Sequence, residues 1–549
     1  MTTTAPQPTS RGASAVFAGI LSSRIAGLVR EILLRSLLGI GAVADALAVA
    51  LRIPNLLQNL LGEGVMSASF IPVYSRMVGD DDEDSGPVAA TVAALLCMIT
   101  AVLVVFMVVF ARPITQVLAF GLPDETLDLA VSLVRIVTLG TGLLVMSAWC
   151  LGVLNSHRHF FLPYFAPVLW NAVQIAVLAY VAIEAWTPVD TATAVAWATV
   201  VGSGAQLAIQ IPSVLRLEPG LRRRGWWVPR HPLVRSVLAR FVPGIIARGA
   251  VQLSAYIDQF LASFLAAGAV SSLMSAQVLY LLPISLFVMS VAAAELPELS
   301  RNPGAIATVR TRLVEGLERV WFFIGFTVVA YVLAGDLIVA LLFERNRFGP
   351  DDTTLVALVL AAYALGMPAV GTSRLLQNVL YSRGDARTPA QLATTRLVVS
   401  VAVGILLMFP LDQLFVYDGN LSGWANITFL LEPLPAGVRE NEDLPLRAGA
   451  VGLALGAAAG AWVENLLLRS RVQLVLGQRR LGGGRLVPVI TSSAVSAVVL
   501  LATKAATDSW PSAVRAVVVV GLAGVAYLVA SYASGVGPAR EAVAALRRD

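Results

Sequence analysis

The sequence predicts an all-α, polytopic membrane protein with about 14 transmembrane helices, arranged as two pseudo-symmetric six-helix lobes followed by two C-terminal helices. Three observations predict this fold class. The 549 residues are 57% hydrophobic and only 13% charged, and the mean hydropathy of +0.78 lies far above that of soluble domains. Fourteen apolar segments reach the roughly 20 residues needed to cross a bilayer. Two sequence motifs recur at nearly the same offset, which indicates an internal repeat.

The apolar segments are expected to be helices, because backbone polar groups in lipid must be hydrogen-bonded within the segment and the runs are too long for barrel strands. Their approximate centres are residues 27, 55, 99, 142, 173, 203, 252, 283, 331, 366, 400, 457, 495 and 525. The polar residues 1–12 lack a signal-peptide pattern, so the first apolar segment is expected to be retained.

The internal repeat defines the two lobes. LRSLLGIGAV at 34–43 resembles LASFLAAGAV at 261–270, and VLNSHRHFFLP at 153–163 resembles VLYSRGDARTP at 379–389. An even number of spans in each lobe implies a parallel repeat, a transporter-like design with the site between the lobes. The predicted divisions are a cytoplasmic tail (1–12), a first lobe (13–215), a basic linker (216–236), a second lobe (237–475) with an external insertion at about 411–447, and two last helices with a cytoplasmic tail (476–549).

The distribution of basic residues predicts the orientation. With the N-terminus inside, the cytoplasmic segments carry 24 of the 39 Lys and Arg residues, the outer loops carry seven, and eight lie within spans. This asymmetry predicts that both termini are cytoplasmic. The same topological bias accounts for the net charge of +5, so the charge does not indicate a nucleic-acid partner.

The first two spans carry charges that a membrane would ordinarily exclude. A charge at the bilayer centre costs roughly 2.5–3.5 kcal/mol on insertion scales and is tolerated when it faces a protein interior or a wet cavity. At about 100° per residue, the charges of the first span fall within roughly 140° and those of the second within roughly 80°. Cations outnumber anions, which favours an anion-binding cavity over an ion-pair network that only holds the helices together. The charged residues are Arg24, Arg30, Glu31, Arg35, Asp45, Arg52 and Glu63.

Several kinds of chemistry have no sequence support. His157, His159 and His231 are the only histidines, no HExxH motif is present, and Cys97 and Cys150 both lie in apolar segments, so no metal site is expected. The one lysine follows Thr503, which excludes a Walker A motif. Transport energy is therefore expected from a gradient, the membrane potential or the cargo itself. A glycine ladder at 452, 456 and 460 predicts close helix packing.

Four stretches of the sequence resemble the MurJ/MviN family of lipid II flippases, in the MOP exporter superfamily. They are SRIAGLVREILLRSLLGIGAVADALAVALRIPNLLQNLLGEGVMSASFIPVY (23–74), LNSHRHFFLPYFAPVLWN (154–171), LFERNRFGPDDT (342–353) and YSRGDARTPA (381–390). The resemblance covers essentially the whole chain. It implies a bacterial inner-membrane protein with a central cavity that moves undecaprenyl-pyrophosphate-linked disaccharide-pentapeptide to the outer leaflet. The last two spans would line a groove for the lipid tail, and cell-wall synthesis proteins are the implied protein partners.

The resemblance also implies the site residues, with some departures from the family. Val278 stands where members have a span 8 arginine that is central to substrate binding, and Gln58 and Asn59 stand where many members have basic residues. Arg248 in span 7 is the residue expected to compensate. The implied substrate-binding residues are Arg24, Arg30, Arg52, Asp45, Glu63, Arg248 and Arg374.

Sodium coupling is not predicted, and no cofactor is expected. Asp258 matches an acidic position that coordinates sodium in some members of the family. Ser400, Gly404 and Ala457 stand near the positions of its expected partners, and none is acidic. Asp258 is therefore retained only as a weak candidate for ion coupling, beside coupling to the membrane potential or to another cation.

The residues and the resemblance agree chemically. A pyrophosphate is a compact anion whose oxygens suit the planar arginine fork. A cell interior at negative potential favours its outward movement by roughly 2.3 kcal/mol per charge per 100 mV, without ATP. Two alternatives remain, which are export of another polyprenyl-linked glycan and a non-transporting membrane scaffold for cell-wall synthesis. A membrane enzyme acting on the same lipid would need a catalytic constellation, and the sequence offers none.

Overall fold

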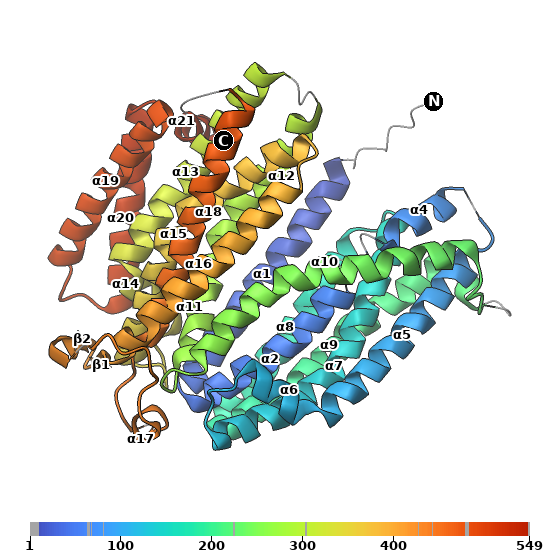
Figure 1. Cartoon of the computed structure of the whole chain (residues 1–549), viewed down its shortest axis with the longest axis horizontal. Helices are drawn as coiled ribbons and strands as arrows, with labels where there is room; N and C mark the ends of the chain where they lie inside the picture. Colours follow the sequence, from blue (N-terminus) through green and yellow to red (C-terminus); the bar gives the residue numbers. More distant parts are fainter. Residues whose placement is uncertain are drawn as a thin grey trace. The chain divides into compact units, whose positions relative to one another are not determined.

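The computed structural model comprises two helical units, residues 1–263 and 264–549 (Figure 1). The residues that it describes are 10–62, 66, 69–80, 82–222, 226–301, 305–426, 428–441, 443–477 and 483–546. For some helical residues the description is limited to the backbone, and these include 53–54, 56–57, 59–60 and 242–255. We describe each unit by itself.

The first unit is built around one long central helix, α7, which packs against α2, α5, α6 and α9. Its residues Leu133, Val134 and Val137 are fully buried in the apolar core of this unit. Helix α1 packs along α8, and its C-terminal end reaches the same apolar core through Leu34 and Leu38. The helices are α1 (Ser10–Leu38), α2 (Ala42–Leu61), α4 (Ile71–Gly79), α5 (Ser85–Val109), α6 (Ala111–Leu118), α7 (Asp124–Ser156), α8 (Phe161–Glu184), α9 (Pro188–Leu217), η1 (Pro219–Arg222) and α10 (Pro232–Ala262).

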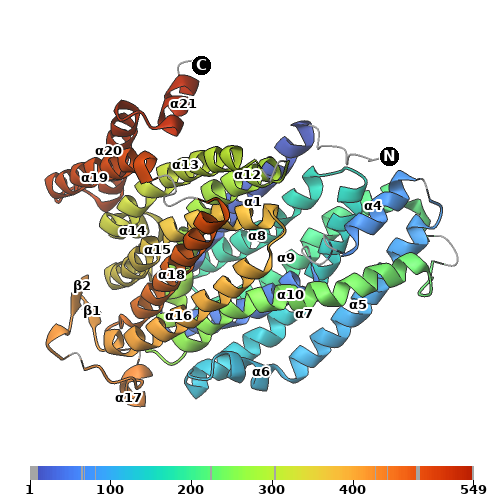
Figure 2. The ribbon, with the colours of Figure 1, turned by 45° about the horizontal axis from the view of Figure 1, so that its top comes forward.

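The second unit has the same plan around α15, which packs against α11, α13, α14 and α18. Figure 2 shows α19 and α20 beside α13 and α14 at the end of this unit. Its elements are α11 (Ala269–Pro283), η2 (Ile284–Val288), α12 (Met289–Arg301), α13 (Ile306–Leu333), α14 (Gly335–Phe343), α15 (Pro350–Ser382), α16 (Arg387–Asp412), β1 (Phe415–Tyr417), β2 (Asn420–Ser422), η3 (Trp424–Asn426), α17 (Ala436–Arg439), α18 (Gly449–Val475), α19 (Gly483–Ala506), α20 (Ser512–Ala533) and α21 (Gly537–Leu546).

The internal repeat is visible in the backbone of two turns. Arg158 after α7 has a φ of 61°, and Gly384 after α15, at the predicted offset of 226 residues, has a φ of 78°. The amide of Arg158 donates to the carbonyl of Asn155 at 3.0 Å, and the amide of Gly384 donates to that of Tyr381 at 2.9 Å. Glycine adopts this left-handed conformation without a steric cost, whereas arginine rarely does. The two turns therefore share one geometry with different residues.

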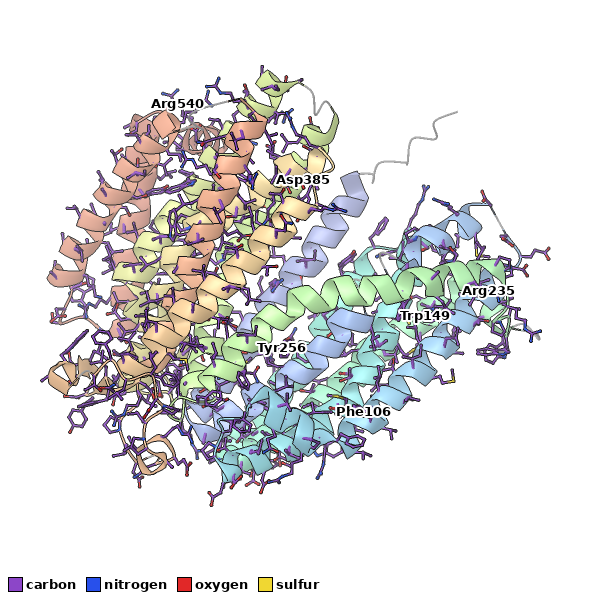
Figure 3. All side chains as sticks on the ribbon, viewed as in Figure 1. Phe106, Trp149, Arg235, Tyr256, Asp385 and Arg540 are labelled. Atoms are coloured by element: carbon purple, nitrogen blue, oxygen red, sulfur yellow. The ribbon has the colours of Figure 1, made fainter. Side chains whose placement is uncertain are left out.

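The sequence repeat and the contacts in the structure assign helix α10 to different units. The sequence repeat places residues 237–262 at the start of the second lobe. In the structure α10 packs against α2, α4, α5 and α6, and the boundary between the units follows Ser263. Tyr256 lies on α10 (Figure 3). Its hydroxyl donates to the carbonyl of Arg52 on α2 at 2.8 Å. The division by contacts thus lies one helix later than the division by sequence.

Each of the fourteen predicted span centres lies in a helix of the structure. Among the described residues, eleven helices are long and apolar enough to cross a membrane. The other three predicted spans fall on α1, α2 and α10, each of which carries charged residues. The polytopic helical fold is therefore confirmed, and the total of 14 spans stays a prediction.

The glycine ladder of α18 brings that helix against α16, as the sequence predicts. A methyl group at Gly456 would lie 2.6 Å from both the amide nitrogen of Gly404 and the carbonyl oxygen of Ser400, and one at Gly452 would meet the backbone of Met408 at 2.5 Å. No side chain fits at either position. Small residues therefore let the two helices pack backbone to backbone.

The C-terminal pair α19 and α20 packs on α13 and α14 through two apolar clusters and is also held by a few polar contacts. Lys504 donates to the carboxylate of Asp336 at 2.7 Å and to the carbonyl of Leu333 at 3.0 Å. The hydroxyl of Tyr527 donates to the carbonyl of Phe322 at 2.6 Å. The opposite faces of both helices carry exposed valines and leucines, as suits helices in contact with lipid.

The insertion at 411–447 contains a small antiparallel hairpin of β1 and β2, with Tyr417 opposite Asn420. Asp418 and Gly419, with φ angles of 51° and 72°, form its two-residue turn. The amide of Gly419 donates to Asp351 at 2.6 Å, which attaches the hairpin to the start of α15. The insertion is thus folded onto the second unit.

Candidate functional site

The charged stripe of α1 forms a buried three-residue cluster. Glu31 receives hydrogen bonds from Arg35 at 2.9 Å and from Arg30 at 3.2 Å, one on each carboxylate oxygen. Glu31 and Arg35 are only 4% and 3% exposed. Removing one partner of a buried ion pair leaves an uncompensated charge, which is strongly destabilising. The Glu31–Arg35 pair therefore has a structural role. Two cations share one anion, which leaves an excess positive charge within α1.

Arg30 is the member of this cluster that is available to a ligand. Its side chain is 20% exposed, compared with 4% for that of Arg35. Its guanidinium lies 5.0 Å from the ring centre of Trp170 on α8, at cation–π distance. Its Nε is buried and has no hydrogen-bond partner among the described residues. The Trp170 ring and Glu31 together hold the guanidinium in place while leaving hydrogen-bonding capacity unused.

The predicted residues of α2 are only partly described. Asp45 is buried in the first turn of α2, where a carboxylate is favoured by the helix dipole. Arg52 is half-buried, and its carbonyl accepts the hydrogen bond from Tyr256. Glu63 lies outside the described residues, as do the side chains of Asn59 and Arg248. Arg24 is described and lies exposed on α1.

In the second unit Arg374 belongs to a polar network that connects three helices. It contacts Gln377 on the same helix at 3.4 Å, and Gln377 donates to Glu464 of α18 at 3.0 Å. The other oxygen of Glu464 accepts from Arg396 of α16 at 3.2 Å. Glu464 is 1% exposed, whereas Arg374 is exposed and the side chain of Arg396 is 33% exposed. A buried anion thus organises two arginines, as Glu31 does in the first unit.

Sequence reasoning did not identify Arg396 and Glu464 as site residues. The signal was present, because both are charges within otherwise apolar spans of α16 and α18. The half-buried Val278 lies on α11, the helix on which Gln277 donates to Tyr363 of α15 at 3.0 Å. The polar network around Glu464 therefore takes its arginines from α15 and α16, and α11 carries none.

The candidate ion-coupling residues lie in different units. Asp258 is partly buried on α10 of the first unit. Ser400 and Gly404 lie where α16 meets the glycine ladder of α18, in the second unit. Their backbone atoms at this contact face another helix.

A second buried polar cluster lies beside the turn that follows α7. Tyr74 of α4 donates to Glu218 at 2.8 Å, and Ser85 of α5 donates to the same oxygen at 3.0 Å. The Nε2 atom of His157 lies 3.3 Å from the hydroxyl of Tyr74 and 3.8 Å from Glu218. Burial lowers the pKa of His157, although the nearby Glu218 acts in the opposite direction. Burial and Glu218 both raise the pKa of Tyr74.

Comparison with known proteins decides the family. The family model described as lipid II flippase MurJ matches residues 34–435. The chain belongs to the MurJ family. A probable lipid II flippase MurJ of Rhizobium tropici is 32% identical over 428 residues, which cover 75% of this chain and 78% of the relative. The lipid II flippase MurJ of Burkholderia cenocepacia is 32% identical over 455 residues, covering 82% and 80%. MurJ proteins are transporters, so this membership does not indicate an enzyme.

Solved structures of MurJ and of a related transporter share the fold. A lipid II flippase MurJ in an inward closed conformation superposes with a TM-score of 0.74 over 95% of this chain and 98% of that chain, at 21% identity. An inward-facing MATE family transporter of the MOP superfamily superposes with a TM-score of 0.62 over 85% of this chain, at 15% identity. These likenesses confirm the predicted fold class.

Proposed function

We propose that this chain moves lipid II from the inner to the outer leaflet of the bacterial inner membrane by alternating access, with its membrane-embedded arginines binding the pyrophosphate. The observation that carries the proposal is Arg30. Its charge is only half compensated by Glu31, which also serves Arg35. The sequence relatives that match most of the chain bear the name lipid II flippase.

The first unit supplies a guanidinium suited to a diphosphate. The exposed part of the Arg30 guanidinium can donate charge-assisted hydrogen bonds to phosphate oxygens, an interaction that suits its planar, always-charged form. Trp170 limits rotation of the guanidinium, which reduces the entropy lost on binding. Arg24 and Arg52 add positive charge on the neighbouring turns of α1 and on α2. Asp45 and Glu63 keep the net charge low enough for the cargo to leave.

The second unit supplies further cations. Arg374 and Arg396 flank the Gln377–Glu464 contact. Because Glu464 is buried and satisfied, it can fix Arg396 in one orientation while the exposed side of the guanidinium remains open to a ligand. These two arginines take the part that a span 8 arginine plays in other members of the family, and Arg248 is a further candidate for it.

The energy for transport comes from the membrane potential. Outward movement of an anion is favoured by roughly 2.3 kcal/mol per charge per 100 mV when the interior is negative. Collapsing the potential at constant pH gradient should reduce outer-leaflet lipid II in cells that depend on this chain. Replacing sodium by choline at constant potential should leave it unchanged. A loss caused by sodium removal alone would assign the coupling to sodium and to Asp258 instead.

The decisive experiment measures lipid II at the outer leaflet in a host depleted of its own flippase. The host would express this chain, its Arg30→Ala or Arg396→Ala variant, or an Arg112→Ala control at matched membrane abundance. Arg112 is exposed and pairs with Asp128 on the first unit, outside the cluster around Glu31. We expect the wild type and the control to restore lipid II accessibility, and both site variants to lose most of it.

Other results would support the alternatives. If the folded wild type restores no outer-leaflet lipid II, the absence of an α11 arginine at Val278 favours another polyprenyl-linked glycan as cargo. If growth is rescued equally by the wild type and the arginine variants, a scaffold that recruits cell-wall synthesis proteins explains the function better. In either case the transporter fold stands.

A further inference from the structure

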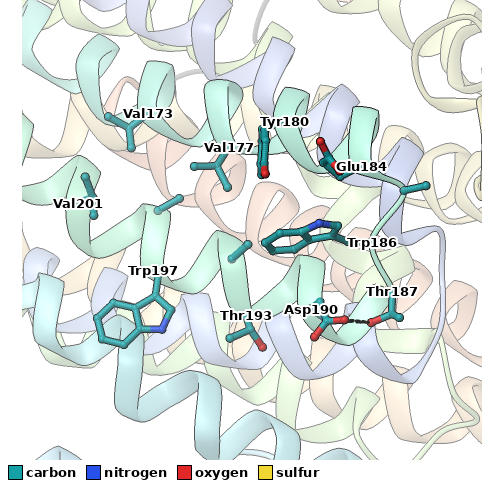
Figure 4. A pocket seen from close by; sticks show the side chains of 13 residues that line it. Val173, Val177, Tyr180, Glu184, Trp186, Thr187, Asp190, Thr193, Trp197 and Val201 are labelled. Carbon is teal, nitrogen blue, oxygen red and sulfur yellow. Dashed lines mark hydrogen bonds between the residues drawn. The ribbon is translucent and has the colours of Figure 1, made fainter.

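A cavity of about 810 Å³ lies between α8 and α9 of the first unit, at the end where the two helices are joined. None of the charged clusters described above lines it. Val173, Val177 and Val201 form its deeper apolar wall together with Trp197, and the rings of Tyr180 and Trp186 border it nearer the loop (Figure 4). Figure 4 shows the Trp186 ring extending into the space between the helices, between Tyr180 on α8 and Thr193 on α9.

The aromatic rings are arranged as a partial box. The ring centres of Tyr180 and Trp186 lie 6.0 Å apart, with their planes at 79°. Ala185, at the end of α8, has a φ of 50°, and this left-handed residue turns the chain so that Trp186 follows directly over the cavity. Trp197 borders the cavity from α9. Ring faces of this kind attract cations, most strongly those of tryptophan.

The charge around the cavity has one sign. Glu184 and Asp190 line it, and none of its lining residues is a lysine, arginine or histidine. Asp190 accepts a hydrogen bond from the Thr187 hydroxyl at 2.6 Å, which fixes its carboxylate. No ion pair of Glu184 is recorded in the part of the chain that the structure describes. Two carboxylates beside aromatic faces match a cationic group and repel an anionic one.

The length of this cavity, which opens as a groove between α8 and α9, matches the thickness of one leaflet of the bilayer. From Glu184 to Val173 the helix rises about 16 Å, at about 1.5 Å per residue. Half of a hydrocarbon core of about 30 Å is about 15 Å. The carboxylates and Trp186 therefore lie at the level of the headgroups when the valines lie along an acyl chain. A ligand that fits both parts has a cationic head and an apolar tail.

We propose that the α8–α9 groove binds a zwitterionic phospholipid whose headgroup ends in an ammonium group. The ammonium sits between the ring faces of Tyr180 and Trp186 and is paired with Glu184, while one acyl chain lies against Val173, Val177 and Trp197. The site is separate from the arginines that carry the cargo. It holds a structural lipid of the leaflet on the loop side of α8 and α9.

Native mass spectrometry of the purified full chain tests the proposal. The protein in detergent is mixed with equal amounts of phosphatidylethanolamine and phosphatidylglycerol of the same acyl chains, and the retained lipids are counted. The variants are Glu184→Gln and Trp186→Ala. The control is Glu125→Gln, since Glu125 is an exposed acid of the same unit that does not line the groove.

We expect the wild type and E125Q to retain phosphatidylethanolamine in preference to phosphatidylglycerol by about fivefold or more, and each site variant to lose most of that preference. Both substitutions change exposed side chains, and an unchanged thermal midpoint would confirm that each variant is folded. Equal retention of the two lipids by the wild type would overturn the proposal. So would an undiminished preference in both E184Q and W186A, because the selectivity would then arise elsewhere on the protein.

Discussion

At the scale of single residues, Glu31 determines how the charge of α1 is used. Its carboxylate neutralises Arg35, which is almost inaccessible, and only half compensates Arg30. Arg35 therefore serves folding, and Arg30 is free to serve binding. The two roles can be separated experimentally, because substitution of Arg35 should reduce stability, whereas substitution of Arg30 should reduce transport.

Arg35→Gln is expected to destabilise the protein strongly, by about 3–5 kcal/mol, since Glu31 would lose its closest buried partner. The double variant Glu31→Gln/Arg35→Gln should be less destabilised than the sum of the single variants, because neither charge is left alone. Chemical denaturation of the purified protein in detergent measures both effects. Arg112→Gln, which removes an exposed pair, should cost no more than about 1 kcal/mol. Wild-type stability of R35Q would contradict this assignment.

His157 is expected to make the first unit less stable in acid. Burial lowers its pKa in the folded protein below the usual value near 6.5. Between the lowered pKa and about 6.5 the unfolded chain binds more protons, so stability falls as the pH drops through that window. Thermal midpoints between pH 7.5 and 5 should decline for the wild type and decline less for His157→Asn. His231→Asn, outside this cluster, should keep the decline, and an identical pH profile for H157N and wild type would exclude His157 as its source.

At the scale of elements, the contact between α16 and α18 depends on the absence of side chains. Gly456→Ala would place a methyl group 2.6 Å from backbone atoms of Gly404 and Ser400. Overpacking of this kind costs about 1–3 kcal/mol, and neither backbone can move without separating the helices. Gly521→Ala is the matched control, because a methyl group there meets nothing within 4 Å. We expect G456A to lower the thermal midpoint and G521A to leave it unchanged or raise it, since alanine favours helix; equal effects would contradict the packing argument.

The sequence predicts the elements well where one physical signal dominates. Apolar length places the helices, because every backbone group in lipid must be satisfied internally. Glycine spacing predicts the α16–α18 contact, because only small residues allow it. The short helices α6 and α14 escape prediction, since eight or nine residues between longer helices have no span-length signal. The left-handed conformation of Arg158 escapes it too, because arginine gives no indication of a positive φ.

At the scale of the whole molecule, the sequence predicts the repeat and the charged stripes, and it misses how individual charges are shared. Arg30 and Arg35 are the same residue type at the two edges of one charged stripe, and the sequence does not show that one contacts Trp170 while the other is buried against Glu31. Arg396 is likewise visible in the sequence as a charge within an apolar span, but its pairing with Glu464, 68 residues further along the chain, is not. The sequence repeat places helix α10 in the second lobe, whereas its contacts place it in the first unit. No local sequence pattern encodes these contacts.

A parallel repeat predicts that equivalent turns lie on the same side of the membrane, whereas an inverted repeat would place them on opposite sides. The turns after α7 and α15 share their backbone geometry, and an even number of spans separates them, so both should face the cytoplasm with the basic loops. In a cysteine-free background (Cys97→Ser, Cys150→Ala), His159→Cys and Ala386→Cys should react with a membrane-impermeant maleimide only after permeabilisation. Glu125→Cys and Glu432→Cys should react in intact cells. All four residues are exposed, so access to the reagent depends on the side of the membrane rather than on burial. Labelling of H159C and A386C from opposite sides would refute the parallel arrangement, because equivalent turns of a parallel repeat must lie on the same side.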